Sequence, residues 1–420
     1  MKLPTDPYKG VRDFYPSDMA IQKQIFSIWR KAVEKYGYEE YSASVLEPAD
    51  LYKAKSGEEI VSKQTYTFID RGEREVTLRP EMTPTVARMV AARRRELVFP
   101  LRWYSIPNLF RYEQPQRGRL REHWQLNVDI FGIESLQAEI ELVQMACDIT
   151  RGYGLKNENF EVRLNNRKVM NYVSKDVFGL SEEQAHKVSK LIDKKDKVSA
   201  DIFEHGIKEI VGENTPKLLT LLNSKNFEEF TTYLPQTNEE HDGLREIKDV
   251  IAGLEKLGIT NVRFDQTLMR GFDYYTGIVF EVFDMNPANR RSVFGGGRYD
   301  DLLSLFGGEK VPAVGFGAGD VVAQDLMETY GNTANTSSQA NIGICIIGEQ
   351  NTDYALDVAQ ALREKGQKVF VDLSFKKVGD QINNADKRKI PKIICIGDEE
   401  KNTGKYKVKD LATGNEEDHI

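Results

Sequence analysis

The sequence predicts an α/β protein with two domains: a large α+β domain built on a mostly antiparallel sheet, and a small C-terminal α/β domain. Its 420 residues are 40% hydrophobic and 29% charged, an ordinary balance for a globular chain with more than one core. The polar stretch GNTANTSSQAN (Gly331–Asn341) is typical of a flexible linker. Antiparallel strand pairs precede it, and short apolar strands that alternate with amphipathic helices follow it. We therefore expect domains at residues 1–328 and 341–420, joined by a linker at 329–340.

The C-terminal domain is predicted from a regular alternation of strands and helices. Short apolar strands at 342–348 and 391–397 leave no polar face, so both are expected to be buried. Amphipathic helices at 353–366 and 378–389 separate the strands. Strands joined through helices form a parallel or mixed sheet.

In the N-terminal domain, the stretch REVTLRPEMTPTVARMVAARR predicts a strand, a turn and a helix. Thr83 is placed as the N-cap of this helix and Pro84 as its first residue, where a missing N–H costs nothing. Residues from about 168 to 255 are charged and poor in strand patterns, which predicts a helical insertion.

A long-looped antiparallel hairpin is predicted from two strand-like stretches, LRWYSIPNLFRYE and HWQLNVDIFG. Because side chains on a strand alternate between faces, the second strand directs four polar groups to one face, namely His123, Gln125, Asn127 and Asp129. Burying such a row is unfavourable unless partners are supplied, which points to a polar ligand. A sheet with this face in water explains the row equally well.

Arginines on the hairpin indicate an anion as one such ligand. Arg111 and Glu113 leave the first strand on one face, and Arg119 and Arg121 follow in the loop. Convergent guanidinium groups match the oxygen atoms of a phosphate. Alternatively, these arginine-rich runs are solvated surfaces.

Two glycine-rich stretches could approach a ligand closely. Gly295–Gly297 permit close approach of the backbone, or they form a plain turn. GFGAGD (Gly315–Asp320) is a weak candidate for a dinucleotide site, because it lacks the full GxGxxG spacing and stands outside an N-terminal βαβ unit. We expect Asp320 to cap the following helix instead. No Walker-type GxxxxGK[ST] sequence is present.

The stretch LMRGFDYYTGIVFEV (Leu268–Val282) sets Arg270 and the pair Tyr274–Tyr275 at the start of an apolar strand. A cation and two phenols at the mouth of a buried strand raise the possibility of a polar ligand. Alternatively, Arg270 pairs with an acid at the surface and the two tyrosines pack a core edge.

Composition excludes several classes of protein. The net charge of −7 argues against a uniformly basic nucleic-acid-binding surface, although AARRRELV and QPQRGRLREH are local basic runs. Three scattered cysteines, Cys147, Cys345 and Cys395, suggest neither a disulfide framework nor a metal knuckle. No apolar run approaches the ~18 residues that span a bilayer, and MKLPTDPYKG lacks the apolar core of a signal peptide. We expect a cytoplasmic protein that does not bind membranes.

Several of these segments resemble one enzyme family. FRYE…GRLREHWQLNVDIFG resembles motif 2 of class II aminoacyl-tRNA synthetases, and LMRGFDYYTGIVFE and GGGRYDDL resemble the two signatures of the histidyl-tRNA synthetase family. YKGVRDFYPSDM and LRPEMTPTVARM resemble the N-terminal opening and the amino-acid-binding turn of that family. The last 80 residues resemble its anticodon-binding domain, so the likeness spans nearly the whole chain.

The resemblance implies ATP-dependent activation of L-histidine to histidyl-adenylate, and transfer to the 3′ end of histidine tRNA by a homodimer. ATP would bring Mg²⁺ on its phosphates, without dedicated protein ligands for the metal, and the histidine carboxylate would attack the α-phosphate. Arg111 and Arg270 are the implied catalytic residues, which hold the α-phosphate from opposite sides. Arg111, Glu113 and Arg121 are implied to bind ATP.

The implied histidine pocket uses the neutral imidazole, which offers one N–H donor and one acceptor nitrogen. Asp129 would accept from the first and the Tyr275 hydroxyl would donate to the second, while Tyr274 and Tyr299 wall the pocket. A site built in this way rejects analogues that lack these groups by ~10⁴–10⁵, so no editing domain is expected.

The α-ammonium group of histidine would meet Glu81, Thr83 and Gln125. Thr83 alternatively only caps its helix, and the two roles are compatible. The full implied histidine-binding set is Glu81, Met82, Thr83, Arg111, Gln125, Asp129, Arg270, Tyr274, Tyr275 and Tyr299.

Three positions depart from the family pattern. Val322 stands where motif 3 normally has an arginine that contacts the γ-phosphate, and no spacing argument identifies a substitute cation. Ser44 replaces the proline expected in motif 1, which usually builds the dimer interface, although Pro48 lies nearby. Gln114 replaces an arginine common in the motif 2 loop, so this residue gives no support for recognition of the extra 5′ guanosine of histidine tRNA.

The missing arginine keeps a second class of function open. Some histidyl-synthetase-like proteins do not charge tRNA, and act as regulatory subunits of ATP phosphoribosyltransferase or as tRNA sensors. Those regulators generally lose the catalytic signatures and the anticodon domain. This sequence retains both, so the enzyme is the favoured interpretation.

Overall fold

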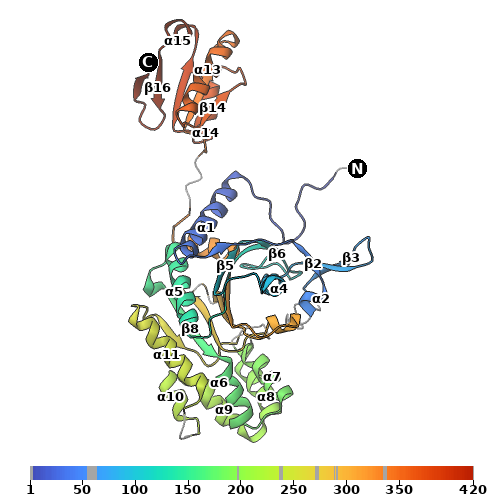
Figure 1. Ribbon diagram of the computed structural model, residues 1–420. Coiled ribbons are helices and arrows are strands. Elements are labelled where there is room, and N and C mark those ends of the chain that lie inside the picture. The colour runs from blue at the N-terminus through green and yellow to red at the C-terminus, as the bar shows by residue number, and fades with distance from the viewer. Residues whose placement is uncertain are drawn as a thin grey trace. The chain divides into compact units, whose positions relative to one another are not determined.

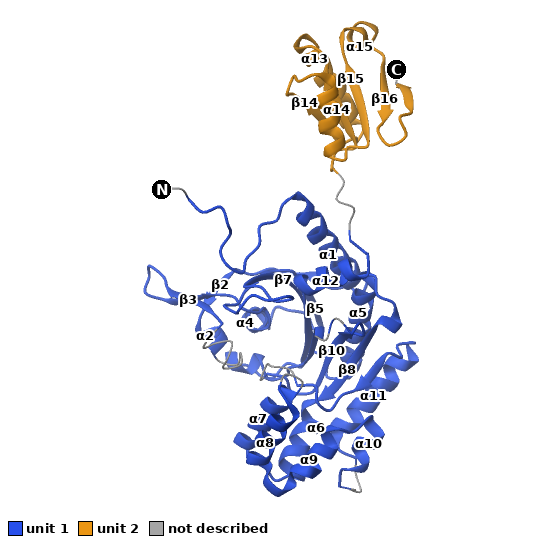
Figure 2. Ribbon diagram, turned by 180° about the vertical axis from the view of Figure 1, so that it is seen from behind, with its two compact units in different colours: residues 1–333 blue, residues 334–420 orange. Residues whose placement is uncertain are grey.

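The computed structural model describes residues 3–53, 64–195, 198–235, 240–269, 274–287, 289, 292–333 and 338–419. The chain forms two compact units, residues 1–333 and 334–420 (Figure 2). The predicted fold class is confirmed, because the first unit contains a large, mostly antiparallel sheet and the second contains a small mixed sheet between helices. Within the described ranges, no helix is both long enough and apolar enough to cross a bilayer.

The first unit is organised around a nine-stranded sheet, in the order β1-β5-β7-β12-β11-β10-β8-β9, with β6 paired to β7. Within the described part of this sheet, β1 with β5 and β8 with β9 run parallel, and the other pairs are antiparallel. The strands are β1 (Glu39–Glu40), β5 (Leu101–Ser105), β6 (Asn108–Phe110), β7 (Glu122–Phe131), β8 (Phe160–Asn166), β9 (Val262–Phe264), β10 (Ile278–Asp284), β11 (Ser292–Arg298) and β12 (Ala313–Gly319).

A smaller antiparallel sheet, in the order β2-β4-β3, leads into helix α4. Figure 1 shows α4 and α5 near the large sheet, with the insertion helices grouped beyond β8. The elements outside the large sheet and the insertion are α1 (Pro16–Glu34), β2 (Leu46–Pro48), α2 (Asp50–Lys53), β3 (Tyr66–Ile69), β4 (Glu75–Leu78), α4 (Thr83–Arg93), α5 (Gln137–Gly152), η1 (Asn157–Asn159), η5 (Leu303–Phe306) and α12 (Asp320–Thr329).

The stretch expected to be helical lies between β8 and β9 and consists of short helices. The longest, α11, has its apolar residues at helical spacing and packs against β8 and α5. These helices are α6 (Arg167–Asn171), η2 (Tyr172–Val177), α7 (Glu182–Ile192), α8 (Ala200–Val211), η4 (Gly212–Asn214), α9 (Thr215–Leu222), α10 (Phe227–Thr232) and α11 (Asp242–Lys256).

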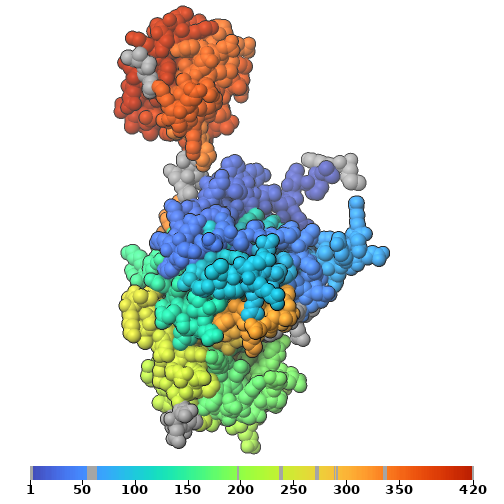
Figure 3. All heavy atoms as spheres, in the orientation of Figure 1, coloured from blue at the N-terminus to red at the C-terminus, as the bar shows by residue number. Residues whose placement is uncertain are grey.

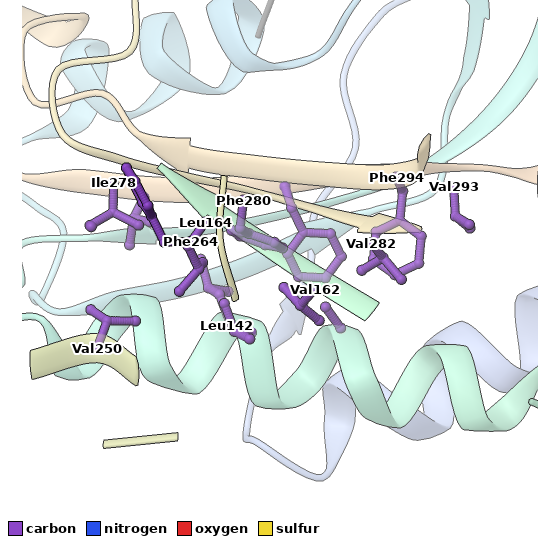
Figure 4. Packing of buried hydrophobic residues seen from close by; sticks show 14 of the residues in the cluster. Leu142, Val162, Leu164, Val250, Phe264, Ile278, Phe280, Val282, Val293 and Phe294 are labelled. Atoms are coloured by element: carbon purple, nitrogen blue, oxygen red, sulfur yellow. The ribbon is translucent and has the colours of Figure 1, made fainter. Parts of the chain in front are cut away.

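The main hydrophobic core lies between one face of the large sheet and helices α1, α5, α11 and α12. Leu126, Val128 and Ile130 of β7 are fully buried in it, as the alternation in the sequence predicts. In Figure 4, Phe280 and Val282 of β10 lie over α5. Because alternate residues of β7 face this core, the polar row of β7 lies on the opposite face of the sheet.

The second unit has its own mixed sheet, in the order β14-β13-β15-β16-β17, and its own apolar clusters. β13 is parallel to β14 and β15, and β16 is antiparallel to β15 and β17. Its elements are β13 (Ile342–Ile346), η6 (Glu349–Asn351), α13 (Thr352–Glu364), β14 (Val369–Asp372), α14 (Val378–Lys387), β15 (Lys392–Ile396), α15 (Asp398–Thr403), β16 (Tyr406–Asp410) and β17 (Glu416–His419).

Both predicted helix caps are wrong. Helix α4 begins at Thr83 itself, with Met82 as its N-cap and without a side-chain cap bond, because the Met82 backbone already lies in the right-handed helical region. Helix α12 begins at Asp320, with Gly319 as its N-cap. The Asp320 carboxylate instead accepts hydrogen bonds from the Arg12 guanidinium and the Trp124 N–H.

Candidate active site

The polar face of the large sheet has a floor of glycines beside the polar row of β7. The strand register sets Gly315 opposite Asp129, Gly317 opposite Asn127 and Gly319 opposite Gln125. Directly paired residues of antiparallel strands share a face, so the polar side chains stand next to positions that have none. We call Gly295 and Gly297 of β11 together with Gly315, Gly317 and Gly319 of β12 the glycine floor.

Replacing a glycine of the floor by a residue with a side chain would crowd the neighbouring side chains of β7. A Cβ atom on Gly315 would clash with the Asp129 carboxylate and with the Val128 carbonyl. A Cβ atom on Gly317 would lie 2.8 Å from Cδ of Gln125. The glycines at these positions therefore leave room for the Asp129 and Gln125 side chains to lie across β12.

Asp129 is the buried carboxylate of this face. It is 3% exposed, and its Oδ1 accepts a hydrogen bond from the Tyr299 hydroxyl. Its Oδ2 has no partner in the part of the chain that the structure describes. Burial raises the pKa of Asp129 to about 7, against the opposing effect of the Tyr299 hydrogen bond. Burial and the nearby Asp129 charge also raise the pKa of Tyr299.

The signature GGGRYDDL divides its residues between the two faces of the sheet. Gly297 belongs to the glycine floor, and Tyr299, directly after β11, reaches Asp129. Arg298 lies on the other face, where Nε and Nη2 donate to the two carboxylate oxygens of Glu139 at 2.5 and 2.7 Å. This buried ion pair fixes β11 to helix α5 beneath the site.

Tyr274 links the second signature to the turn before α4. Its hydroxyl donates to Glu81 Oε2 at 3.1 Å, across 193 positions of sequence. Its ring centroid lies 4.9 Å from that of Tyr275 and 5.7 Å from that of Tyr299. Met82, which follows Glu81, is fully buried. The structure thus brings together the predicted residues of three separate segments.

Thr83, the first residue of α4, and Gln125 of β7 are both half-buried. The predicted capping role of Thr83 is not observed, because Met82 holds the N-cap position of α4, and the ligand-binding role of Thr83 stays a prediction. The Gln125 side chain lies close above Gly317 of the glycine floor.

Arg111 is held at the junction of the hairpin and the α4 turn. Its Nε donates to the Pro80 carbonyl at 2.8 Å, and its backbone N–H donates to the Arg121 carbonyl at 2.9 Å. Glu113 pairs with Arg119 at 3.4 Å. The guanidinium of Arg111 therefore lies beside the turn that carries Glu81.

Arg121 packs against the N-terminal segment. It donates to the Glu113 carbonyl at 3.1 Å and to the Tyr8 hydroxyl at 3.0 Å, and its guanidinium lies 4.1 Å from the centre of the Tyr112 ring. Its backbone N–H donates to the Gly10 carbonyl at 2.7 Å. Arg121 thus joins the hairpin loop to the N-terminal segment.

Arg270, the second predicted catalytic arginine, lies outside the described residues. The chain just before it is fixed, because Asn165 of β8 donates to the Leu268 carbonyl at 3.0 Å.

Sequence reasoning missed a cation at the start of α12. Arg12 Nη2 lies 2.6 Å from Asp320 Oδ2, two residues before Val322, and Val322 packs against the main core. Burial, with the charges of Arg111 and Arg12, lowers the pKa of His123 to about 3. Arg12 belongs to the recognised segment YKGVRDFYPSDM, but nothing in that segment indicates a partner some 300 residues away.

The basic run AARRRELV lies at the other end of α4. Arg93, Arg94 and Arg95 line an open pocket of about 760 Å³ between α4 and η5, and Arg94 pairs there with Glu309 at 3.2 Å. In Figure 3, the cyan atoms of the α4 segment lie beside the orange atoms of the η5 segment. This pocket does not contain any of the predicted site residues.

Comparison with known proteins identifies the family. The sequence-family model described as histidyl-tRNA synthetase matches residues 10–320, and the family model described as anticodon binding domain matches residues 341–419. A curated relative from Leptospira biflexa serovar Patoc, named histidine–tRNA ligase, is 42% identical over 423 residues, which cover 99% of this chain and 95% of that protein.

Solved structures share the fold. Histidyl-tRNA synthetase from Nostoc sp. PCC 7120 has a TM-score of 0.82 at 24% identity, over 100% of this chain and 97% of that one. Apo histidyl-tRNA synthetase from S. aureus has a TM-score of 0.74 at 26% identity, over the same shares of both chains. The resemblance seen in the sequence is confirmed, and the chain belongs to the histidyl-tRNA synthetase family.

Proposed function

We propose that this chain activates L-histidine with ATP and transfers the histidyl group to the 3′ end of histidine tRNA. The observation that carries the proposal is the linked set of groups on the polar face. The Asp129–Tyr299 and Glu81–Tyr274 pairs stand beside the glycine floor. This set combines clustered tyrosine rings with carboxylates that can meet the two nitrogen-bearing parts of histidine.

The imidazole ring is proposed to lie among the tyrosines. Asp129 Oδ2 would accept the ring N–H, and the Tyr275 hydroxyl would donate to the other ring nitrogen. Tyr274 and Tyr299, whose rings pack edge to face with centroids 5.7 Å apart, would together wall the pocket. Asp129 Oδ2 has no partner among the described residues, and a buried carboxylate oxygen in that state gains most from such a donor.

The α-ammonium group is proposed to lie at the turn before α4. Glu81 would provide the opposite charge, with the Thr83 hydroxyl and the Gln125 carboxamide as further acceptors. Met82 would support this turn from the core, where it is fully buried. The ammonium group is thereby held away from the ring pocket, which orients the carboxylate towards the hairpin arginines.

The reaction needs no nucleophile from the protein, because the histidine carboxylate attacks the α-phosphate of ATP. Arg111 and Arg270 would stabilise the charge that spreads over the transferring group. Glu113 and Arg121 would contact the nucleotide from the hairpin. Mg²⁺ would travel with ATP and neutralise part of the charge of the outer phosphates.

A second binding surface for tRNA is proposed on residues 341–419, which match the anticodon binding domain. We further propose a homodimer in the cytoplasm, as the family resemblance implies. The comparisons supply nothing that favours the non-charging regulatory alternative, and the relative that is 42% identical is named histidine–tRNA ligase.

A charging assay tests the proposed function. The full chain is incubated with labelled histidine, ATP, Mg²⁺ and a transcript of histidine tRNA, and label on precipitated tRNA is counted. We expect label only when ATP is present, and a rate at least ~10²-fold lower for Arg111→Ala, as for other donors that stabilise transition-state charge. Histidine binding without any charging would refute the enzyme and support the regulatory alternative.

A further inference from the structure

Three buried polar atoms on the polar face have no hydrogen-bond partner within the ranges that the structure describes: Asp129 Oδ2, Tyr41 Oη and Ser105 Oγ. Asp129 and Ser105 are 3% and 2% exposed. A buried polar atom without a partner is unfavourable, and native proteins contain few of them. Their occurrence together indicates a place where a polar ligand completes the hydrogen bonding.

Strand pairing places these three residues on neighbouring strands. Tyr41 directly follows β1, and its N–H donates to the Tyr104 carbonyl of β5 at 2.8 Å. β5 pairs in turn with β7, which sets Ser105 opposite Asn127, two residues from Asp129. Because paired and alternate residues share a face, all three side chains belong to the polar face.

The environment of the Tyr41 phenol agrees with this placement. Burial raises its pKa, the Asp129 carboxylate raises it further, and the Ser105 hydroxyl, which lies within hydrogen-bonding reach of the phenol but is not aligned for a bond, lowers it. The Tyr41 ring centroid lies 5.7 Å from that of Trp103, and both rings pack against the aromatic cluster that contains Tyr299. Tyr41 therefore lies close to Asp129 on the polar face.

We propose that Tyr41 and Ser105 determine specificity for the amino acid, and that their hydroxyls form with Asp129 the polar end of the pocket that receives the N–H of the substrate's ring. The proposal rests on the proposed function, because it assigns both residues to the histidine pocket. Asp129 Oδ2 accepts the ring N–H directly. Tyr41 and Ser105 are positioning residues: once the ring is bound, the Tyr41 hydroxyl donates to the same Asp129 oxygen and the Ser105 hydroxyl donates to the Tyr41 oxygen, two hydrogen bonds that the described residues do not make without a ligand.

Exclusion of rings without an N–H follows from this arrangement. An apolar ring would leave Asp129 Oδ2 and both hydroxyls buried and unpaired, and unpaired buried groups are the main reason why hydrogen-bonding sites discriminate. Tyr41→Phe and Ser105→Ala each remove one hydroxyl with little change in shape. Each variant is expected to bind histidine more weakly and to exclude apolar rings less.

Calorimetry on the full chain tests this inference. Kd is measured for L-histidine and for β-(2-thienyl)-L-alanine, whose five-membered ring has a similar shape but no N–H. The preference for histidine, given as the ratio of the two Kd values, is expected to fall by about tenfold or more in Tyr41→Phe and in Ser105→Ala.

Tyr104→Phe is the matched control. It removes a phenol hydroxyl from the residue next to Ser105, but on the opposite face, where Tyr104 donates to Glu34 Oε1 at 2.9 Å. Its preference is expected to equal that of the wild type. Unchanged preferences in Tyr41→Phe and Ser105→Ala would overturn the inference, and so would an equal fall in all three variants, which would indicate a general loss of packing.

The two proposals fail separately. A wild type that prefers histidine in this binding test but does not charge tRNA refutes the proposed function alone. A wild type that charges tRNA, combined with variants of unchanged preference, refutes only the inference about Tyr41 and Ser105.

Discussion

At the scale of single residues, Asp129 is the buried carboxylate at the centre of the polar face, and the Tyr299 hydroxyl donates to it. Asp129 followed from alternation along one strand, and Tyr274 and Tyr299 followed from two signatures. Tyr41 and Ser105 could not be found in this way, since they reach Asp129 only through the register of three strands. A register is set by tertiary pairing, which one sequence does not display.

The raised pKa of Asp129 predicts a pH-dependent stability. Its pKa in the folded chain, about 7, lies above the ordinary value of 3.8. The protonated carboxyl therefore contributes stability that is fully present below about pH 4 and is lost as the pH rises through about 7. Asp129→Asn keeps an acceptor for Tyr299 and removes the titration.

Urea unfolding of both proteins at several pH values between 4 and 8 measures this effect. The free energy of unfolding of the wild type is expected to fall relative to that of Asp129→Asn by up to about 4 kcal/mol as the pH rises. Parallel pH profiles would show that Asp129 is solvated and titrates normally.

At the scale of elements, the strands were predicted better than the helix starts. The hairpin pattern correctly indicated β7 and its apolar face, because a strongly alternating strand carries its own signal. The starts of α4 and α12 were each misplaced by one residue, because cap preferences were overridden by the backbone at Met82 and by the Arg12–Asp320 pair. The glycine floor could be predicted only in part. The glycines can be read from the sequence, but the register of β11 with β12 that places them side by side cannot.

Two glycine substitutions near the site are expected to have different effects, one on the KM for histidine and the other on the stability of the fold. A Cβ atom on Gly317 meets the flexible end of Gln125, so Gly317→Ala is expected to fold and to raise KM for histidine by about tenfold or more. Gly296 faces the core, where a Cβ atom would clash with the Gly315 carbonyl, so Gly296→Ala is expected to destabilise the fold. Thermal unfolding and steady-state kinetics distinguish the two, and a stable Gly296→Ala with normal kinetics would contradict this account of the register.

The ion pair between Arg298 of β11 and Glu139 of α5 is expected to contribute strongly to the stability of the fold. Side-chain exposures are 8% for Arg298 and 0% for Glu139, so Glu139→Gln removes the closer, fully buried counter-charge of a nearly buried cation and leaves only the more exposed Asp300 at 3.3 Å. The expected loss is about 3–5 kcal/mol in the free energy of unfolding. The double variant Glu139→Leu with Arg298→Met is expected to recover part of this loss, and chemical denaturation of the three variants and the wild type provides the comparison.

At the scale of the whole molecule, the chain divides into two units with separate cores. The composition of Gly331–Asn341 indicated a linker, and the alternation beyond it indicated the mixed sheet of the second unit. The predicted site residues that the structure describes all lie in the first unit. Activation of histidine and binding of tRNA are therefore expected to depend on different parts of the chain.

Truncation after Thr333 tests this division. The shortened chain is expected to keep histidine-dependent exchange of pyrophosphate, because it retains both signatures and the hairpin. Its charging of tRNA is expected to fall by at least ~10²-fold, because a second binding surface on one chain raises the effective affinity by that order. Equal losses of both activities in a folded truncated chain would contradict the division of labour.

The central claim is that the polar face activates histidine, and exchange of labelled pyrophosphate into ATP tests it most directly. The purified full chain is incubated with ATP, Mg²⁺ and labelled pyrophosphate, with and without L-histidine. Label is expected to enter ATP only when histidine is present, and to do so at least ~10²-fold more slowly in Arg270→Ala and Arg111→Ala. Exchange that does not require histidine, or no exchange by a folded chain that binds histidine, would contradict the account.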